Sequence, residues 1–326
     1  MDQQDISRRK FLESGFAAAG LMAISGASFG MPAYIKNLGK PNSLFKGVQI
    51  GVISYSWRSM PSSAEQVLQY CIDSNISAIE LMGPAVEAFA GAPELPFERQ
   101  GRKALTAEQK SLQEEYILKL AQWRATVPMT RFQQLGKLYK KAGVKIYGYK
   151  PSALGEKNTD AEVDYAFRAA KALGANQANV EKPSDAETKR LGDIASKNKI
   201  YAGYHGHTQQ TFDWWDKALE QSKYNALNFD MGHYVAAGFD PIELLEAKHQ
   251  HIVSMHTKDR KNKANGGDNV VWGEGDTPIV QVLQMMRDKK YKFPATIELE
   301  YPIPQGSDAV KETAKCVEFA RKALGA

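Results

Sequence analysis

The feature of this 326-residue chain that most limits its fold is a regular alternation of short β-rich runs with helical stretches. The β-rich runs cover residues 48–57, 77–83, 145–151, 175–182, 199–207, 225–233, 251–259 and 295–302. Between them, apolar residues recur at three- and four-residue spacing, as in AEQVLQYCIDS and PIVQVLQMMRDKK, which is typical of amphipathic helices. Eight strand-helix units predict an α/β fold, a single-domain (β/α)8 TIM barrel over residues 47–326. A doubly wound open sheet is the alternative, but no G-x-G-x-x-G turn follows the first run.

One connection is much longer than the others. Residues 84–128 lie between the second β-rich run and the helix before the third, and they include a Pro/Gly-rich part and an amphipathic helix. Because this insertion follows the C-terminal end of a strand, we expect it on the face where barrel active sites are built. We interpret it as lid-like. A dimer contact is the alternative, so a homo-oligomer stays open.

The first thirty residues are typical of an export signal. Arg8 and Arg9 precede a Phe-Leu pair and a weakly hydrophobic Ala/Gly-rich run in SRRKFLESGFAAAGLMAISGASFG, the pattern of a twin-arginine signal. The apolar run is too short and too Gly-rich for a transmembrane helix, so we expect no stable membrane insertion. An amphipathic helix is the alternative. The sequence thus predicts a signal peptide over 1–30, a linker over 31–46 and a periplasmic location.

Charge and cysteine content narrow the partners. The net charge of +5 is modest, and no Lys/Arg block is interleaved with aromatic residues, so nucleic-acid binding is not expected. Two cysteines, Cys71 and Cys316, are too few for a disulfide framework. They fall in the first and last predicted helices, which are neighbours in a closed barrel. Two buried free thiols are favoured, and one disulfide is the alternative.

Ionisable side chains gather at the C-terminal ends of runs five to eight. In chain order they are His205, His207, Asp230, His233, His256, Lys258, Glu298 and Glu300. Since these strand ends meet at one face of a barrel, we expect the side chains to lie together. Two carboxylates and two imidazoles suit a divalent cation, whereas burying such groups without one is costly. The pattern predicts a metal site with Asp230 as a ligand and His233 beside it; a structural polar cluster is the alternative.

The segments YHGHTQQTF, DMGHYVAAGFDP, MHTKDR, WGEGD and IELEYP resemble the xylose-isomerase-like sugar phosphate isomerase/epimerase superfamily, and its exported twin-arginine branch in particular. The resemblance covers the chain from about residue 48 to its end. It implies a (β/α)8 barrel with a divalent metal, commonly manganese, cobalt, magnesium or zinc. By position it implies four metal ligands, which are His205, Asp230, His256 and Glu298.

One position departs from the keto-sugar epimerases of that superfamily. They place a glutamate on strand five, paired with the strand-eight glutamate, so that the two exchange protons on opposite faces of the substrate. Here the position is His205. One-base chemistry, either aldose-ketose isomerisation or elimination next to a carbonyl, therefore fits better than symmetric epimerisation. Glu181, at the end of run four, would restore a second carboxylate, and an ordinary ion pair with a lysine is its alternative role.

The resulting hypothesis is proton abstraction next to a carbonyl of a carbohydrate. Glu298 or Glu181 is the expected base and His207 or His233 the expected acid. The candidate substrate-binding residues are Trp57, Glu80, Lys258 and Arg260. Export favours a free sugar, keto-sugar or 3-keto-glycoside over a sugar phosphate, and the product class, isomerase/epimerase or lyase/dehydratase, stays open. The alternatives are a non-catalytic periplasmic sugar-binding barrel and a metal-dependent phosphodiesterase.

Overall fold

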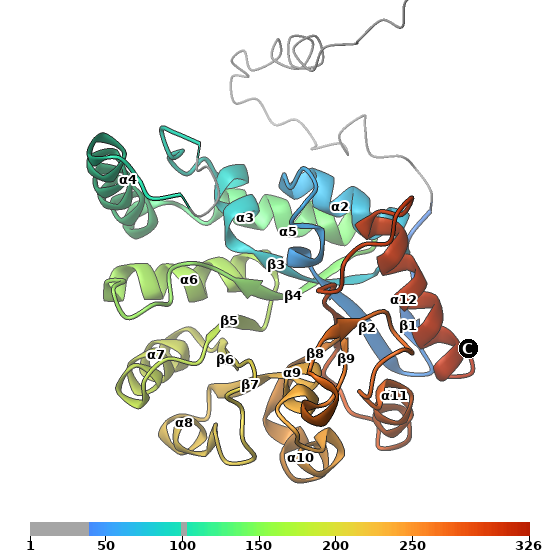
Figure 1. Ribbon diagram of the computed structural model, residues 1–326. Helices are drawn as coiled ribbons and strands as arrows, with labels where there is room; N and C mark the ends of the chain where they lie inside the picture. Colours follow the sequence, from blue (N-terminus) through green and yellow to red (C-terminus); the bar gives the residue numbers. More distant parts are fainter. Residues whose placement is uncertain (1–38, 99–102) are drawn as a thin grey trace, which may run out of the picture. The chain divides into compact units, whose positions relative to one another are not determined.

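A computed structural model describes residues 39–98 and 103–326, and a closed barrel in these residues confirms the predicted fold (Figure 1). Within the described chain, eight parallel strands form the ring β2-β11-β8-β7-β6-β5-β4-β3, and the pairing of β2 with β3 closes it. The strands are β2 (Val48–Ile53), β3 (Ala78–Met82), β4 (Lys145–Lys150), β5 (Gln177–Glu181), β6 (Tyr201–His205), β7 (Asn225–Asp230), β8 (Ile252–Thr257) and β11 (Ala295–Ile297). The predicted signal over 1–30 lies outside the described residues.

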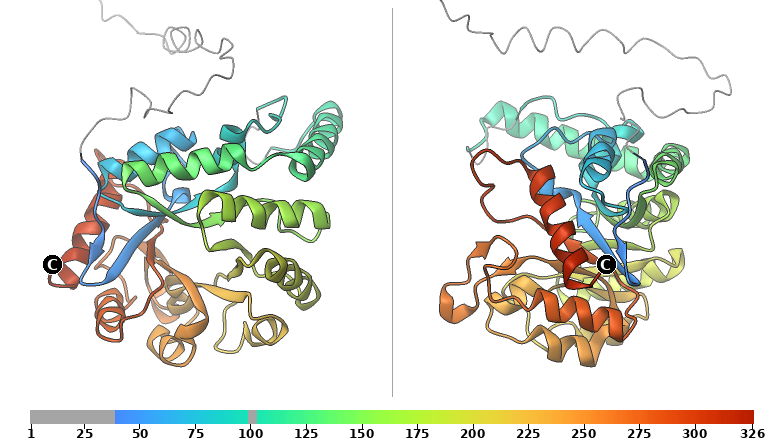
Figure 2. Two further views of the ribbon diagram at one scale, coloured as in Figure 1. Left: turned by 180° about the vertical axis from the view of Figure 1, so that it is seen from behind. Right: turned by 90° about the vertical axis from the view of Figure 1, so that its right-hand side faces the viewer.

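A ring of helices surrounds the strands, as Figure 1 and the left view of Figure 2 show. The helices are α2 (Ala64–Asp73), α3 (Gly83–Ala90), α4 (Ala107–Thr126), α5 (Thr130–Ala142), α6 (Asp160–Leu173), α7 (Asp185–Asn198), α8 (Asp216–Gln221), α9 (Met231–Ala236), α10 (Pro241–Lys248), α11 (Ile279–Asp288) and α12 (Ala309–Ala323). Capping boxes fix several starts, such as Ser63 with Gln66 at α2 and Thr159 with Glu162 at α6. Each N-cap stabilises its helix by about 1 kcal/mol. No helix in the described ranges is long and apolar enough to cross a membrane.

The first described residues lie before the predicted barrel start. Part of the segment predicted as a linker, Leu44–Phe45, forms the short strand β1, which pairs antiparallel with β2. The Ser43 hydroxyl also donates a 2.6 Å hydrogen bond to the carbonyl of Ile50. The chain is therefore attached to the barrel several residues before β2 begins.

A layer of polar side chains crosses the interior of the barrel. Gln177 and Asn228 both donate to the Ser254 hydroxyl, at 2.5 and 2.7 Å, and all three side chains are fully buried. Buried polar groups need such partners. Side chains two apart on a strand share a face, so Asn228 and Ser254 lie one layer below Asp230 and His256. The polar layer thus supports the strand ends that carry the predicted ligands.

The long insertion is anchored to the outer helices. Arg124 of α4 pairs with Glu87 of α3 at 2.8 Å and with Glu162 of α6 at 3.1 Å, and all three side chains are buried. Trp123 also packs edge-on against Tyr165 of α6. Figure 1 shows α4 on the outer side of α3 and α6. The lid-like role of residues 84–128 stays a prediction, since these contacts establish only where α4 is held.

The two cysteines are both buried and free. Cys71 lies in α2 and Cys316 in α12, the first and last helices around the barrel. The structure therefore has the two buried thiols that the sequence favours over a disulfide.

Candidate metal centre

The four predicted metal ligands meet at the C-terminal end of the barrel. His205 ends β6, Asp230 ends β7, His256 lies in β8 and Glu298 directly follows β11. All four are buried, and one potential ligand atom from each lies within 4.8 Å of the others. Residues far apart in sequence are thus brought into one compact group because their strands are neighbours in the ring.

Asp230 has two separate tasks at its strand-to-helix turn. Its Oδ1 accepts a 2.8 Å hydrogen bond from the backbone N–H of His233 and so caps α9. Its Oδ2 lies 3.9 Å from both His205 Nε2 and His256 Nδ1. Gly232 leaves the space that the turn needs, since a Cβ there would lie 2.3 Å from Lys258 Cγ. The DMGH motif therefore ends a strand, starts a helix and directs one carboxylate oxygen into the site.

His256 lies between two buried carboxylates. Its Nδ1 is 2.9 Å from Glu298 Oε2, and its Nε2 is 3.1 Å from Glu80 Oε2. Burial alone would lower the pKa of His256, but the two glutamates raise it to about 10. The imidazole is therefore protonated at neutral pH in this arrangement. Glu80 also holds the His256 ring, and its predicted contact with substrate stays a prediction.

His205 is kept neutral and oriented. Its Nδ1 donates to Asn228 Oδ1 at 2.9 Å, because the Asn228 amide nitrogen is already directed at Glu80 and Ser254. Burial, together with the positive charges of Lys150 and His256, holds the pKa of His205 well below its ordinary value. The lone pair of Nε2 therefore faces the Asp230 side of the site, as a metal ligand requires.

Lys258 places a charge among the same carboxylates. Its Nζ lies 2.9 Å from Asp230 Oδ2, 2.6 Å from Glu298 Oε2 and 2.8 Å from Glu300 Oε2. Burial opposes the charged form, but the three carboxylates raise the pKa of Lys258 above its ordinary value. Lys258 and His256 in turn hold the pKa of Glu298 well below its ordinary value, although burial acts in the opposite direction. The ammonium thus compensates part of the negative charge.

The donor set fits a divalent cation. Four carboxylates face two cations here, the protonated His256 and Lys258, which leaves an excess of negative charge; the carboxylates are Glu80, Asp230, Glu298 and Glu300. Although Lys258 is near, Asp230 Oδ2 accepts no well-aligned hydrogen bond. An unsatisfied buried carboxylate oxygen costs free energy. Mixed imidazole and carboxylate donors are suitable for Mn, Co, Zn or Mg.

Glu181 and His207 lie together at the rim. Glu181 Oε1 is 2.9 Å from Lys150 Nζ, and Glu181 Oε2 is 3.8 Å from His207 Nε2. Both Glu181 and His207 are about half exposed, and with His205 they form a second group of potential ligand atoms within 4.8 Å. Glu181 is therefore both an ion-pair partner of a lysine, as the sequence alternative predicted, and a neighbour of the site.

His233 lies beside His207 at the rim. Its Nε2 is 3.7 Å from Glu300 Oε2, and Arg260 donates to its Nδ1. Burial, Lys258 and Arg260 lower the pKa of His233 to about 2, so the ring is neutral at pH 7. The ring centroids of His207 and His233 are 4.6 Å apart. The structure thus brings the predicted acid candidates together above the metal-ligand set.

The WGEGD loop fixes the end of β8. Asp259 accepts hydrogen bonds from the backbone N–H groups of Gly273, Gly275 and Thr277 at 2.8, 2.9 and 3.2 Å. A Cβ at Gly275 would lie 2.0 Å from Asp259 Oδ1, so the close approach requires glycine. The loop thereby positions the neighbouring Arg260 beside His233.

A sequence model of the family described as xylose isomerase-like TIM barrel matches residues 94–322. This chain belongs to the xylose isomerase-like TIM barrel family. A sequence comparison with curated proteins finds no match.

Solved structures share the family fold at low sequence identity. A D-psicose 3-epimerase with D-tagatose from Clostridium cellulolyticum has a TM-score of 0.57 and 11% identity over 85% of this chain and 99% of its own. A probable 3-DHS dehydratase from Bacillus anthracis has a TM-score of 0.56 and 14% identity, covering 83% and 98%. A xylose isomerase-like TIM barrel protein from Mycobacterium smegmatis, in complex with magnesium, has a TM-score of 0.51 and 13% identity, covering 85% and 96%. These likenesses show the fold alone. The first two proteins are named for different reactions, an epimerisation and a dehydration, and yet both are similar in fold to this chain.

One of the predicted substrate-binding residues, Trp57, lies away from the candidate site. Trp57 is completely buried, and its Nε1 donates to Thr313 Oγ1 of α12 at 3.1 Å. The strand ends at Ile53 and a short 3-10 helix, Ser54–Trp57, follows, so the strand alternation does not extend to Trp57. The assignment of Trp57 to a substrate surface is therefore wrong. The nearby Tyr55 is 38% exposed.

Two contributors to the site were not identified from the sequence. Asn228 orients His205, and Lys150, on β4, pairs with Glu181. Asn228 stands two residues before Asp230, so strand alternation could have placed it on the same face. The sequence offers no comparable indication for Lys150, because its partner is 31 residues away in the chain on a neighbouring strand.

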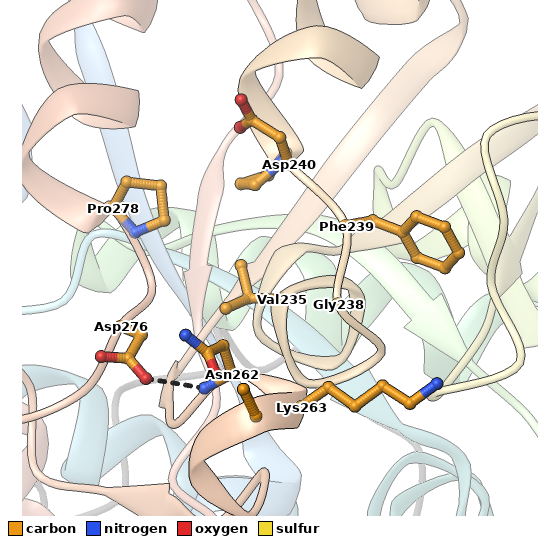
Figure 3. Close-up of a pocket in the computed structure, with 10 residues that line it drawn as sticks. Val235, Gly238, Phe239, Asp240, Asn262, Lys263, Asp276 and Pro278 are labelled. Carbon is orange, nitrogen blue, oxygen red and sulfur yellow. Dashed lines mark hydrogen bonds between the residues drawn. The ribbon is translucent and has the colours of Figure 1, made fainter.

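An open hollow of about 590 Å³ lies between the α9–α10 loop and residues 262–278 (Figure 3). Phe239, 41% exposed, and the carboxylates of Asp240 and Asp276 line it. Asp276 accepts from the backbone N–H of Asn262 at 2.8 Å. None of the four predicted metal ligands lines the hollow, and neither His233 nor Arg260 does.

Proposed function

We propose that this chain is a divalent-metal-dependent enzyme that removes a proton next to a carbonyl group of a free sugar, keto-sugar or 3-keto-glycoside. The observation that supports this most is the buried group of His205, Asp230, His256 and Glu298 at the C-terminal strand ends, the face on which barrel enzymes build their sites. An enzyme of the isomerase/epimerase or lyase/dehydratase class would use this arrangement.

The chain's own residues would hold the cation in a defined way. His205 Nε2 and Asp230 Oδ2 already face the site, and His256 would exchange its proton for the metal, as metal binding to imidazole requires. When bound, the cation supplies a Lewis acid that polarises the substrate carbonyl and lowers the energy of proton removal next to it. Asn228 and Glu80 keep the two imidazoles in orientation.

Of the two predicted bases, Glu181 fits better than Glu298. Glu298 is buried, bonded to His256 and 2.6 Å from Lys258, so it is committed to the metal-ligand group. Glu181 is half exposed, and its Oε2 is 3.8 Å from His207. We propose that Glu181 takes the proton from carbon. His207 then passes a proton to a substrate oxygen. Arg260 and the neutral imidazole of His233 would bind a hydroxyl group of the substrate.

We further propose that the enzyme acts outside the cytoplasm. The motivation is the Arg8-Arg9 pattern before the Ala/Gly-rich run. Phosphorylated sugars are then not the expected substrates. Cell fractionation tests the location: Arg8→Lys with Arg9→Lys should leave the full-length protein in the cytoplasm. Unchanged periplasmic recovery of that double variant would contradict export by this route.

The activity is tested by measuring metal content and hydrogen exchange together. Purified protein should contain about one divalent cation per chain by elemental analysis. With keto-sugars or 3-keto-glycosides in D2O, NMR should show deuterium entering next to the carbonyl, and the product identifies the branch. Glu181→Gln should retain the metal and lose exchange, whereas Glu187→Gln, at a glutamate paired with Arg190 on α7, serves as the matched control.

Two results would overturn the proposal. Substrate binding without deuterium incorporation, after manganese or cobalt is supplied, would leave a sugar-binding barrel. Cleavage of a phosphodiester with no effect on sugars would leave a metal-dependent phosphodiesterase.

A further inference from the structure

The end of the barrel opposite the metal centre carries a concentration of positive charge. We define the basic face as the eight segments that lead into the barrel strands, residues 46–47, 73–77, 140–145, 171–176, 196–200, 221–224, 249–251 and 287–294. Because all eight strands are parallel, their N-terminal ends meet at this one end of the molecule. The basic face is therefore a single surface.

The net charge of this face differs strongly from the net charge of the rest of the chain. Its segments contain twelve Lys or Arg residues and two acidic residues, Asp73 and Asp288, which gives a net charge of +10. The whole chain carries +5, so the remaining residues sum to −5. Eleven of the twelve basic side chains are exposed, and Arg287 is half-buried. A separation of this size creates a strong positive field at one end.

Three of these lysines occupy backbone conformations that do not favour them. Lys46, Lys199 and Lys290 have φ values of 48°, 58° and 57°, in the left-handed region. A residue with a Cβ costs roughly 1–2 kcal/mol there, a cost that glycine avoids. In the described residues, the only other non-glycine with positive φ is Asn75, on the same face. Lysines that break a local backbone preference at three positions on one face point to a role for their charge.

Helix stabilisation accounts for only part of the charge. Lysines in the last turn of a helix interact favourably with its dipole, as Lys140 and Lys141 do in α5. Lys145, Lys223 and Lys292, in contrast, stand beyond the helix ends, at or just before a strand. Their side chains form no ion pair in the described structure. These three lysines are therefore available to a partner.

The chain also enters the barrel on this face. The Asn42 backbone N–H donates to Asn75 Oδ1 at 2.9 Å, and Asn75 Nδ2 donates to the Asn42 carbonyl at 3.1 Å. Lys40 packs so closely on Gly143 that a Cβ there would lie 2.9 Å from Lys40 Cβ. Asn75 and Gly143 both belong to the basic face. The apolar run predicted as an export signal therefore precedes a segment that is attached at this end.

We propose that the basic face binds the surface of a membrane that contains anionic phospholipid, with the metal centre directed away from the bilayer. Lysines near such a surface each contribute about 1 kcal/mol of attraction. Tyr201, 37% exposed and packed against Tyr224, adds an aromatic pair of the kind found at membrane interfaces. This inference is independent of the proposed catalytic activity.

Vesicle co-sedimentation of the full chain tests the proposal. The probe is vesicles of one third phosphatidylglycerol and two thirds phosphatidylcholine, with EDTA present so that the metal centre plays no part. Lys145→Glu, Lys223→Glu and Lys292→Glu together should lower partitioning about 100-fold or more, since three lysines are reversed. The matched control reverses three exposed lysines outside the face: Lys110→Glu, Lys157→Glu and Lys263→Glu. The control variant should bind the vesicles like the unchanged chain. Roughly 0.5 M salt should release both proteins from the vesicles.

The N-terminal segment is present in every variant, so binding through it alone would be equal in all of them. Equal partitioning of the face and control variants would therefore overturn the proposal, provided circular dichroism shows that both are folded. Equal binding to pure phosphatidylcholine vesicles would overturn it as well. Binding to duplex DNA without binding to anionic vesicles would assign the face to a different polyanion and contradict a membrane partner.

Discussion

The two ends of the barrel use charge in opposite ways. At the C-terminal end, Asp230, Glu298 and Glu80 are buried beside two imidazoles and one ammonium. At the N-terminal end, the lysines of the basic face are exposed and mostly without acidic partners. Charges at the first end are desolvated and strongly coupled, whereas those at the second are screened by water and salt. The same strands thus carry a site sensitive to single atoms at one end and a surface governed by total charge at the other.

The largest effect is expected from Asp230→Asn. Asparagine is an equally good N-cap, so α9 keeps its start, but the carboxylate oxygen that faces His205 and His256 is lost. Divalent-metal affinity, measured by isothermal titration calorimetry, should fall more than about 100-fold, because even outer partners of ligands contribute 10–100-fold. Asp240→Asn, at the N-cap of α10, is the matched control and should retain the affinity of the unchanged protein. Equal affinity of both variants would show that the buried acidic group is structural.

Lys258→Met tests how strongly the buried charges are coupled. Removing the ammonium leaves three carboxylates without their nearest cation, and breaking a buried ion pair typically costs about 3–5 kcal/mol. Urea unfolding in EDTA should show a loss of this size. A bound divalent cation should recover much of it and should bind more tightly than to the unchanged protein.

The control for this variant comes from the other end of the barrel. Lys223→Met removes an exposed lysine and should change the free energy of unfolding by less than about 0.5 kcal/mol. A loss for Lys258→Met that is the same with and without metal would mean that the ammonium does not share the metal's position.

Because strand ends in a parallel barrel converge, the sequence could predict that Asp230, His256 and Glu298 lie together, whereas their choice as metal ligands came from the family resemblance. The sequence did not identify what holds them. His256 is bonded to Glu80, 176 residues away, and such a pair depends on side-chain geometry across the barrel. Trp57 was misassigned because the alternation was extended past Ile53, where a 3-10 helix begins. The basic face could not be predicted from the sequence, because its lysines are spread along the chain and only the closed ring brings them together.

The pH dependence of the unfolding free energy distinguishes the buried, coupled charges at the C-terminal end of the barrel from the exposed charges at its N-terminal end. The pKa of His256 is about 10 in the folded protein and near 6.5 when unfolded. Its contribution to stability is therefore complete below pH 6.5 and is lost as pH rises through 10, with a slope of up to about 1.4 kcal/mol per pH unit. In EDTA, His256→Gln should have a flatter dependence of unfolding free energy over this range. His251→Gln, at an exposed histidine, should follow the unchanged protein.

Metal binding should show the opposite dependence, since the cation displaces the His256 proton. Affinity should therefore rise between pH 6.5 and 10. A slope that His256→Gln leaves unchanged would assign the proton to another group.

The smallest effect separates charge from backbone geometry on the basic face. Lys199→Gly removes a Cβ from a left-handed residue, so the free energy of unfolding should rise by about 0.5–1 kcal/mol, while anionic-vesicle affinity should fall about fivefold through the lost charge. Lys197→Gly, two residues earlier within α7, loses the same charge but should lower stability by about 1 kcal/mol, because glycine is unfavourable in a helix. If vesicle affinity followed stability rather than charge in this pair, the lysines would not act as a charged surface. If it fell equally in both, the left-handed lysine would be a position where stability is sacrificed for binding.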